Sequence, residues 1–135
     1  MSLIEPYWSD RYRYEKVYVV ENDKGEKQVN IQERYVKKGD EIYMFHPAYV
    51  TQPTRTSIQA WHKHFEDELG QYLNHHCKPN AKIVVSQPLY HGVTSIMLVA
   101  LKRISFGYEV TFDYRTTETK LSHPFKCKCH GKWIR

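Results

Sequence analysis

The sequence predicts a single, mostly β domain with one or two short helices. Its 135 residues are enough for one domain with a real hydrophobic core. Apolar residues occur mainly in short runs, and several runs alternate with polar residues as half-buried strands do. Gly, Pro, Asn and Asp separate the runs and supply turns between them. Short strands therefore outnumber the single helical pattern near the middle of the chain.

The first strands are predicted in the N-terminal third. Residues 16–36 predict a β-hairpin, because a Val and Tyr run at 17–20 is followed by the turn residues "NDKG" at 22–25. Apolar and polar residues then alternate again in "QVNIQ". The next stretch, "KKGDEIYMFHP", predicts a turn at Gly39 and a short strand that ends at Pro47.

The middle of the chain predicts the one clear helix, at residues 58–72. Apolar residues recur there at steps of three and four, which is typical of one helix face. These residues are Ile58, Trp61, Phe65, Leu69 and Tyr72. Thr56 is expected to cap the helix, with Gln59 three residues further on as in a capping box. Gly70 is expected to end or bend it.

Further strands are predicted after this stripe. Residues 81–86, "AKIVVS", and residues 94–104, "TSIMLVALKRI", are two apolar, strand-like runs. A turn at Gly107 leads into "YEVTFDY" at 108–114, where polar and apolar side chains alternate.

The composition indicates an intracellular protein. The first residues lack the apolar core of a signal peptide, and the longest apolar run, "IMLVAL" at 96–101, is too short to span a bilayer. Three Cys residues give no even-numbered disulfide framework. We therefore expect a cytoplasmic or nuclear location, reduced thiols and no membrane partner.

The positive charge is concentrated in the C-terminal tail. Residues 115–135 hold six Lys and Arg side chains against Glu118 alone, so the tail carries a charge equal to the +5 of the whole chain. A basic tail can attract nucleic acid or an acidic protein surface. It can equally be a solvated tail without a partner, and composition leaves both possibilities open.

The segment "NHHCKPN" at 74–80 is an unusual cluster of polar side chains directly after the apolar stripe. Buried polar groups need partners, so the cluster is either an accident of composition or a site. It is followed by "GYEVTFDY" at 107–114 and "FKCKC" at 125–129, and it is preceded by "RTSIQ" at 55–59. In this order and spacing the segments resemble the SET domain of protein lysine methyltransferases.

The resemblance implies a fold and an activity. The fold would be a β-clip or SET-type arrangement of small sheets around a knot-like, threaded C-terminal segment. The activity would be S-adenosylmethionine-dependent methylation of a lysine in a protein substrate. Residues 1–122 would form the SET-like domain, of which the first fifty match only loosely, and residues 123–135 would form a partial post-SET tail.

The resemblance also implies the site residues. Tyr114 would be the catalytic tyrosine, and Phe112 would shape the lysine channel, where Phe leaves room for higher methylation than Tyr does. Aromatic walls suit this chemistry because desolvation disfavours the ammonium form of lysine, and only the neutral amine is nucleophilic. The cofactor-binding residues would be Asn74, His75, Tyr72, Phe125 and Gly25.

The cysteines are compatible with a post-SET zinc site. Cys77, Cys127 and Cys129 would occupy three of its four positions, and no Cys fills the fourth. His130 or His76 could substitute, or the three thiols could simply be packed in a small core. Both interpretations stay open.

The chain departs from the family pattern in the segment that should contact the cofactor. Gly25 lies in "NDKGEKQV" at 22–29, which lacks the second Gly of the usual Gly-x-Gly loop. His76 stands where Ser is usual, and Tyr108 where Glu is usual. Two alternatives to an enzyme follow. One is a catalytically degenerate SET-like module that binds protein or nucleic acid, and the other is a small zinc-stabilised structural domain.

Overall fold

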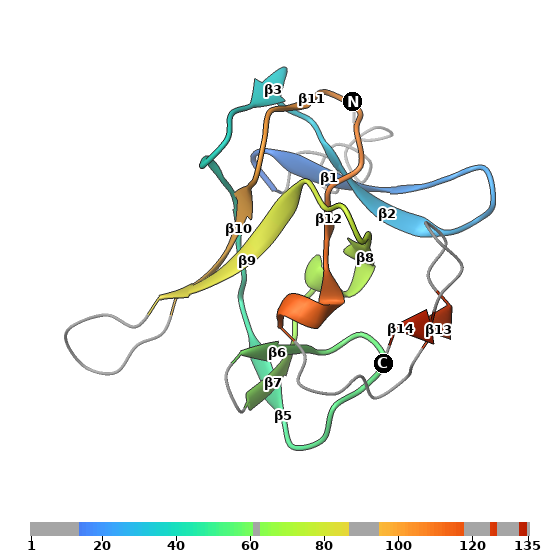
Figure 1. Ribbon diagram of the computed structural model, residues 1–135, viewed down its shortest axis with the longest axis vertical. Coiled ribbons are helices and arrows are strands. Elements are labelled where there is room, and N and C mark those ends of the chain that lie inside the picture. Colours follow the sequence, from blue (N-terminus) through green and yellow to red (C-terminus); the bar gives the residue numbers. More distant parts are fainter. Residues whose placement is uncertain (1–13, 61–62, 87–94, 118–124, 127–132, 135) are drawn as a thin grey trace, which may run out of the picture.

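The fold is built from short strands grouped into small sheets (Figure 1). The computed structural model describes residues 14–60, 63–86, 95–117, 125–126 and 133–134. Within these ranges fourteen strands form six sheets of two or three strands each, and the two helices are 3-10 helices of three residues. The predicted mostly β class is therefore confirmed. None of the helices in the described ranges is long and apolar enough to cross a membrane.

The N-terminal hairpin forms as predicted. Strand β1 (Val17–Glu21) pairs antiparallel with β2 (Lys27–Ile31). The side-chain oxygen of Asn22 accepts two backbone N–H groups of the connecting turn at 2.9 and 3.0 Å. Gly25 has φ of 78°, a left-handed conformation that glycine adopts without strain. The turn is therefore specified by its own residues.

A three-stranded antiparallel sheet has the order β4 (Glu41–Met44), β10 (Ser95–Ala100) and β9 (Ala81–Ser86). Its strands β9 and β10 lie side by side in Figure 1. Every second residue of β10 is buried, as expected for a strand with one face on the core. A short pair, β3 (Tyr35–Val36) with β11 (Ile104–Ser105), extends from one end.

The helix predicted at residues 58–72 is wrong. The segment forms β6 (Ile58–Ala60) and β7 (Lys63–Glu66), which pair antiparallel, followed by the 3-10 helix η2 (Gly70–Tyr72). Strand β5 (Ala48–Val50) pairs with the other edge of β7. The segment predicted as one helix therefore contributes two strands and a single turn of 3-10 helix.

The misleading pattern has a physical explanation. Ile58 and Phe65 are seven residues apart, which is two helical turns, but they are also directly opposite each other across the β6–β7 pair. Both are buried, so cross-strand partners imitate one helix face. Thr56 is not a cap, because its hydroxyl donates to the carboxylate of Glu66 at 2.9 Å. Gln59, the expected capping-box partner, is buried in β6.

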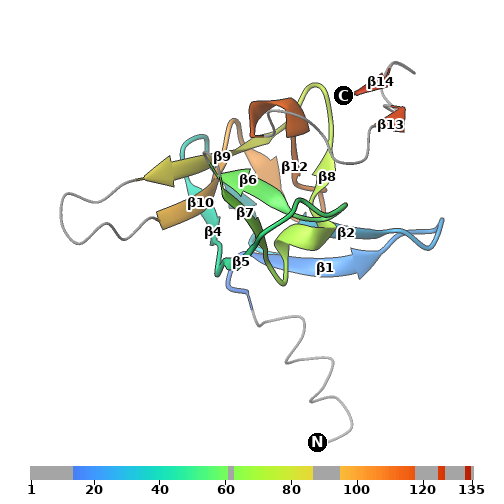
Figure 2. The ribbon, with the colours of Figure 1, turned by 90° about the horizontal axis from the view of Figure 1, so that it is seen from below.

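Two further strand pairs complete the described fold. Strand β8 (Asn74–His75) runs parallel to β12 (Thr111–Phe112), and the 3-10 helix η3 (Tyr114–Thr116) follows β12. The two strands lie side by side in both views (Figure 1, Figure 2). Strands β13 (Phe125–Lys126) and β14 (Trp133–Ile134) pair antiparallel near the C-terminus.

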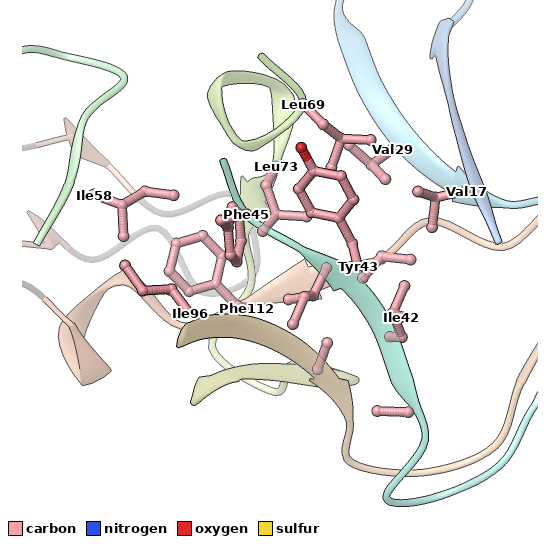
Figure 3. Packing of buried hydrophobic residues seen from close by; sticks show 14 of the residues in the cluster. Val17, Val29, Ile42, Tyr43, Phe45, Ile58, Leu69, Leu73, Ile96 and Phe112 are labelled. Carbon is pink, nitrogen blue, oxygen red and sulfur yellow. The ribbon is translucent and has the colours of Figure 1, made fainter. Parts of the chain in front are cut away.

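One hydrophobic core joins these sheets (Figure 3). It receives buried side chains from the hairpin, from β4 and the residue after it, from the η2 region, from β10 and from β12. The labelled members in Figure 3 are Val17, Val29, Ile42, Tyr43, Phe45, Ile58, Leu69, Leu73, Ile96 and Phe112. Since each sheet alone is too small to be stable, their shared core holds them together.

Among the described residues, one carboxylate, that of Asp67, is buried with this core. Asp67 is 5% exposed, and it accepts hydrogen bonds from the Tyr43 hydroxyl at 2.9 Å and the His46 N–H at 2.7 Å. It also accepts the N–H groups of Leu69 and Gly70 at 3.0 and 2.8 Å, which fixes the start of η2. Figure 3 shows the Tyr43 hydroxyl turned toward Leu69. Burial and the neighbouring carboxylate raise the pKa of Tyr43 above its ordinary value of 10.0.

Candidate active site

Two segments that are far apart in the sequence meet at the β8–β12 pair. In register, Asn74 lies opposite Thr111, and His75 lies opposite Phe112. One further backbone hydrogen bond continues the ladder past the end of β8, where the N–H of His76 donates to the carbonyl of Phe112 at 3.1 Å. The pairing therefore brings the Asn-His segment beside the segment that ends in Tyr114.

The side chain of Asn80 fastens the two segments together. Its Nδ2 donates to the carbonyl of Glu109 at 2.8 Å, and its Oδ1 accepts the N–H of Thr111 at 2.9 Å. Its own carbonyl accepts the N–H of Leu101 at 2.8 Å. A carboxamide has a donor and an acceptor like a peptide group, so Asn80 substitutes for a neighbouring strand at this point.

The chain before β12 is held by the hairpin. The N–H of Val110 donates to the carbonyl of Val29 at 2.7 Å, and the N–H of Gly107 donates to the carbonyl of Ile31 at 2.9 Å. The N–H of Ile31 donates in return to the carbonyl of Tyr108 at 3.1 Å. Backbone from β2 and the side chain of Asn80 thus fix the strand that carries the candidate site.

His75 links three parts of the site. Its side chain is 2% exposed, and its Nδ1 accepts the backbone N–H of Tyr114 at 3.0 Å. Because Nδ1 acts as an acceptor, the ring hydrogen is assigned to Nε2, which lies 3.3 Å from the Sγ of Cys77. The Asp113 carboxylate, 3.5 Å from Nδ1, receives no hydrogen bond from this nitrogen in this tautomer. His75 therefore fixes the backbone at Tyr114.

The phenol of Tyr114 lies against two other rings. Its centroid is 5.2 Å from that of His75 and 4.9 Å from that of Phe112. Its hydroxyl donates to the carbonyl of Leu73 at 3.0 Å, directly before Asn74. A phenol oxygen can accept hydrogen bonds as well as donate one. The phenol is thus held beside the Asn-His segment from both its ring and its hydroxyl.

Asp113 fixes the short helix that begins at Tyr114. Its carboxylate accepts the backbone N–H of Arg115 at 3.0 Å, and it accepts the guanidinium Nε and Nη2 at 2.9 and 2.6 Å. The hydrogen bonds from the Arg115 side chain lower the pKa of Asp113 below its ordinary value of 3.8. This carboxylate therefore fixes the backbone next to Tyr114.

Asn74 is oriented by two acceptors. Its Nδ2 donates to a carboxylate oxygen of Glu109 at 2.8 Å and to the carbonyl of Lys27 at 3.2 Å. Lys27 begins β2, so the hairpin is tied directly to the site. Gly25 lies in the hairpin turn, and a Cβ there would meet nothing within 4 Å. Within the described chain, this glycine serves the positive φ of the turn.

The other predicted site residues lie at varied depths. Phe112 is buried in the core, and Tyr72 is a partly buried residue of η2 that packs against the core. Phe125 lies in β13, whose backbone alone is described. Cys127 and Cys129 fall outside the described residues, as does most of the basic tail. The predicted zinc site and the tail's predicted partners therefore stay predictions.

The described part of the chain contains one thiol. Cys77 is a partly buried cysteine, and its Sγ lies 3.3 Å from Nε2 of His75. Among the residues that the structure describes, no three His, Cys, Asp or Glu side chains are grouped as metal ligands. Cys77 alone does not make up the four-ligand set that structural zinc requires.

Residue types alone did not identify two important positions. Asn80 belongs to "NHHCKPN" and Glu109 to the alternating strand, but neither position reveals its partner in the sequence. The signal that could identify Glu109 is the alternation of side chains along that strand. Val110 and Phe112 are buried while Glu109 and Thr111 are partly exposed, so Glu109 had to lie on the opposite face from the core.

The chain is similar to known proteins along most of its length. The model of the SET domain family matches residues 7–115. A stretch of 67 residues, 49% of this chain, is 33% identical to the human (Homo sapiens) protein histone-lysine N-methyltransferase 2B, and it represents 2% of the length of that protein. The chain thus spans a small part of this curated relative.

A solved structure shares the fold. A Plasmodium falciparum protein, classed as a candidate histone methyltransferase, superposes with a TM-score of 0.60. The match covers 73% of this chain and 96% of that chain at 17% sequence identity. Similarity at this identity concerns the fold alone. The family model, which matches well over half of the residues, shows that the chain belongs to the SET domain family, the lysine methyltransferase family that its sequence resembles.

Proposed function

We propose that this chain is an S-adenosylmethionine-dependent protein lysine N-methyltransferase. The observation that carries the proposal is the convergence of the Asn-His segment with the phenol of Tyr114. The Tyr114 N–H lies 3.0 Å from His75 Nδ1, and its hydroxyl lies 3.0 Å from the carbonyl of Leu73. Residues that the family resemblance assigns to cofactor and catalysis therefore lie next to each other.

The groups at this place fit the proposed cofactor chemically. With both Asn74 amide hydrogens directed to acceptors, its Oδ1 offers an acceptor that suits an ammonium group. The ring faces of aromatic residues such as Tyr114 and Phe112 favour positive charge nearby. S-adenosylmethionine, when bound, supplies a methyl group on a positively charged sulfur. Asn74 and His75 would hold it, with Tyr72, Phe125 and Gly25 as further candidates.

Tyr114 would act by positioning and desolvation. A free lysine has a pKa of about 10.4 and is mostly the unreactive ammonium at neutral pH. A channel lined by Tyr114 and Phe112 disfavours the ammonium, because desolvation penalises the charged form. The fixed hydroxyl oxygen of Tyr114 can accept an N–H of the amine and hold it in line. Alignment of this kind contributes up to about 7–11 kcal/mol in favourable systems.

Phe112 is proposed to influence how many methyl groups the product carries. Its ring packs 4.9 Å from the ring of Tyr114. A Phe has no hydroxyl with which to hold a partly methylated amine through a hydrogen bond. We therefore propose that products beyond the monomethyl state are accessible.

The proposed acceptor is a lysine in a protein. The name of the human relative specifies histone lysine, so histones are the first substrates to test. The purified chain would be titrated with S-adenosylhomocysteine by calorimetry and assayed for transfer of a radiolabelled methyl group to histones and to unrelated basic proteins. We expect binding and label on lysine. No heat at millimolar ligand together with no labelled protein would contradict the proposal and favour a module that binds without catalysis.

A further inference from the structure

We propose that Glu109 is a positioning residue, which sets the hydrogen-bonding direction of Asn74. This inference rests on the proposed function, because it concerns the residue proposed to hold the cofactor. Glu109 Oε2 lies 2.8 Å from Asn74 Nδ2, although the two residues are 35 positions apart in the sequence. Glu109 would act through Asn74, without touching the cofactor.

The donors and acceptors around Asn74 fix the orientation of its carboxamide. A carboxamide has two N–H donors and one oxygen acceptor. Nδ2 faces two groups that can only accept, the ionised carboxylate of Glu109 and the carbonyl of Lys27. A flipped Asn74 would place its oxygen against both acceptors and lose both bonds. The only stable orientation therefore presents Oδ1 away from these two groups, as an acceptor for a bound ligand.

Glu109 is itself held in place by its neighbours. Its carbonyl accepts the side chain of Asn80 at 2.8 Å, and it forms a β-bridge with Asn30 of β2. The next residue, Val110, is completely buried and donates to β2 at 2.7 Å. Because side chains alternate along a strand, burial of Val110 directs the side chain of Glu109 away from the core.

The two acceptors of Asn74 differ in charge. The bond to Asn74 is accepted by an ionised group, and bonds of this kind are about twice as strong as neutral ones. The carbonyl of Lys27, at 3.2 Å, is the longer and neutral partner. Loss of the Glu109 carboxylate would therefore leave Asn74 with the weaker of its two constraints.

The test compares Glu109→Ala and Glu109→Gln with Glu33→Ala, a change at an exposed carboxylate elsewhere. Gln can present an oxygen to Asn74, whereas Ala cannot. We expect Glu109→Ala to weaken binding of S-adenosylhomocysteine about tenfold, and Glu109→Gln about threefold, in calorimetry. In steady-state assays KM for S-adenosylmethionine should rise while kcat stays within about twofold. Glu33→Ala should match the wild-type protein.

A second measurement does not depend on activity. The side-chain amide signals of Asn74, assigned by their loss in Asn74→Asp, should shift in Glu109→Ala and much less in Glu109→Gln. Wild-type affinity in Glu109→Ala, equal losses in the two variants, or unchanged Asn74 signals would each overturn the proposal. If the wild-type protein binds no cofactor, the proposed function fails, and the amide signals still decide the role of Glu109.

Discussion

Two clusters of polar groups, one around Asp67 and one around Asn74 and Tyr114, differ in burial and in the groups that they contact. In the first, the carboxylate of Asp67 is 5% exposed and accepts four hydrogen bonds from the chain, three at Oδ2 and one at Oδ1. In the second, the carboxamide of Asn74 and the hydroxyl of Tyr114 are partly buried and donate within the chain. A carboxylate enclosed by donors of its own chain stabilises the fold, whereas a partly exposed group whose oxygen can accept can also contact a ligand.

This difference predicts that changes at Asp67 affect stability and changes at Tyr114 affect chemistry. The largest effect is expected for Asp67→Ala. The buried hydroxyl of Tyr43 and three N–H groups would lose their acceptor. Because each buried donor left without an acceptor costs about 1–3 kcal/mol, we expect a total loss of at least about 3 kcal/mol. Urea unfolding measures the change in the free energy of unfolding.

A milder change keeps this prediction testable if Asp67→Ala does not fold. Asp67→Asn keeps one acceptor oxygen and places an amide donor against the N–H groups, so it should also lower the unfolding midpoint. Glu33→Ala, at an exposed position, is the matched control and should change stability by less than about 0.5 kcal/mol. Wild-type stability in both Asp67 variants would contradict the role of Asp67 in stabilising the fold.

The next largest effect is expected for Tyr114→Phe, and it should appear in catalysis. Loss of the hydroxyl should lower methyl transfer by about 100-fold, which is within the range for a positioned polar group. The free energy of unfolding should fall by only about 1 kcal/mol, because one hydrogen bond, to Leu73, is lost. Radiolabelled-methyl transfer and urea unfolding are measured on the same preparation. Full activity in this variant would show that the Tyr114 hydroxyl is not needed for methyl transfer.

An intermediate effect is expected at alkaline pH from Tyr43. Burial, first, and the Asp67 carboxylate, second, raise the pKa of this phenol above its ordinary value of 10.0. The unfolded chain therefore ionises first, so this contribution to stability is present below pH 10 and is lost as the pH rises above it. Tyr43→Phe should remove this part of the loss of stability at alkaline pH. Tyr108→Phe, at a residue that is 67% exposed, should leave it unchanged when unfolding is followed from pH 7 to about pH 11.

The smallest effect is expected at acid pH from Asp113. The side chain of Arg115 lowers the pKa of this carboxyl below 3.8, so its contribution is present above the unfolded pKa and is lost as the pH falls through the folded one. The Arg115 side chain is 49% exposed, and solvent screening keeps the contribution below about 1 kcal/mol. Arg115→Gln should raise the pKa of Asp113 toward its ordinary value in an NMR titration. No change would show that the backbone N–H alone sets it.

Much of the strand pattern could be predicted from the sequence. The hairpin, the turns at Gly39 and Gly107, and strands β4, β9 and β10 depend on local turn residues and alternation, and all are confirmed. The helix at residues 58–72 was wrong because a seven-residue spacing fits both two helical turns and a cross-strand pair. Local periodicity cannot separate these alternatives when the segment is short.

The mostly β class, the segments that carry the candidate site and their family resemblance can all be read from the sequence. Which polar groups pair depends on how the chain folds. Asn80 meets Glu109 and Thr111, and Asn74 meets Glu109, across separations of 29 to 35 residues. Such pairs depend on the register of strands that share one core, and a shift of one residue would turn each side chain to the opposite face. The residue types can be read from the sequence. The direction in which Asn74 presents its oxygen depends on neighbours that lie close to it only in the folded chain.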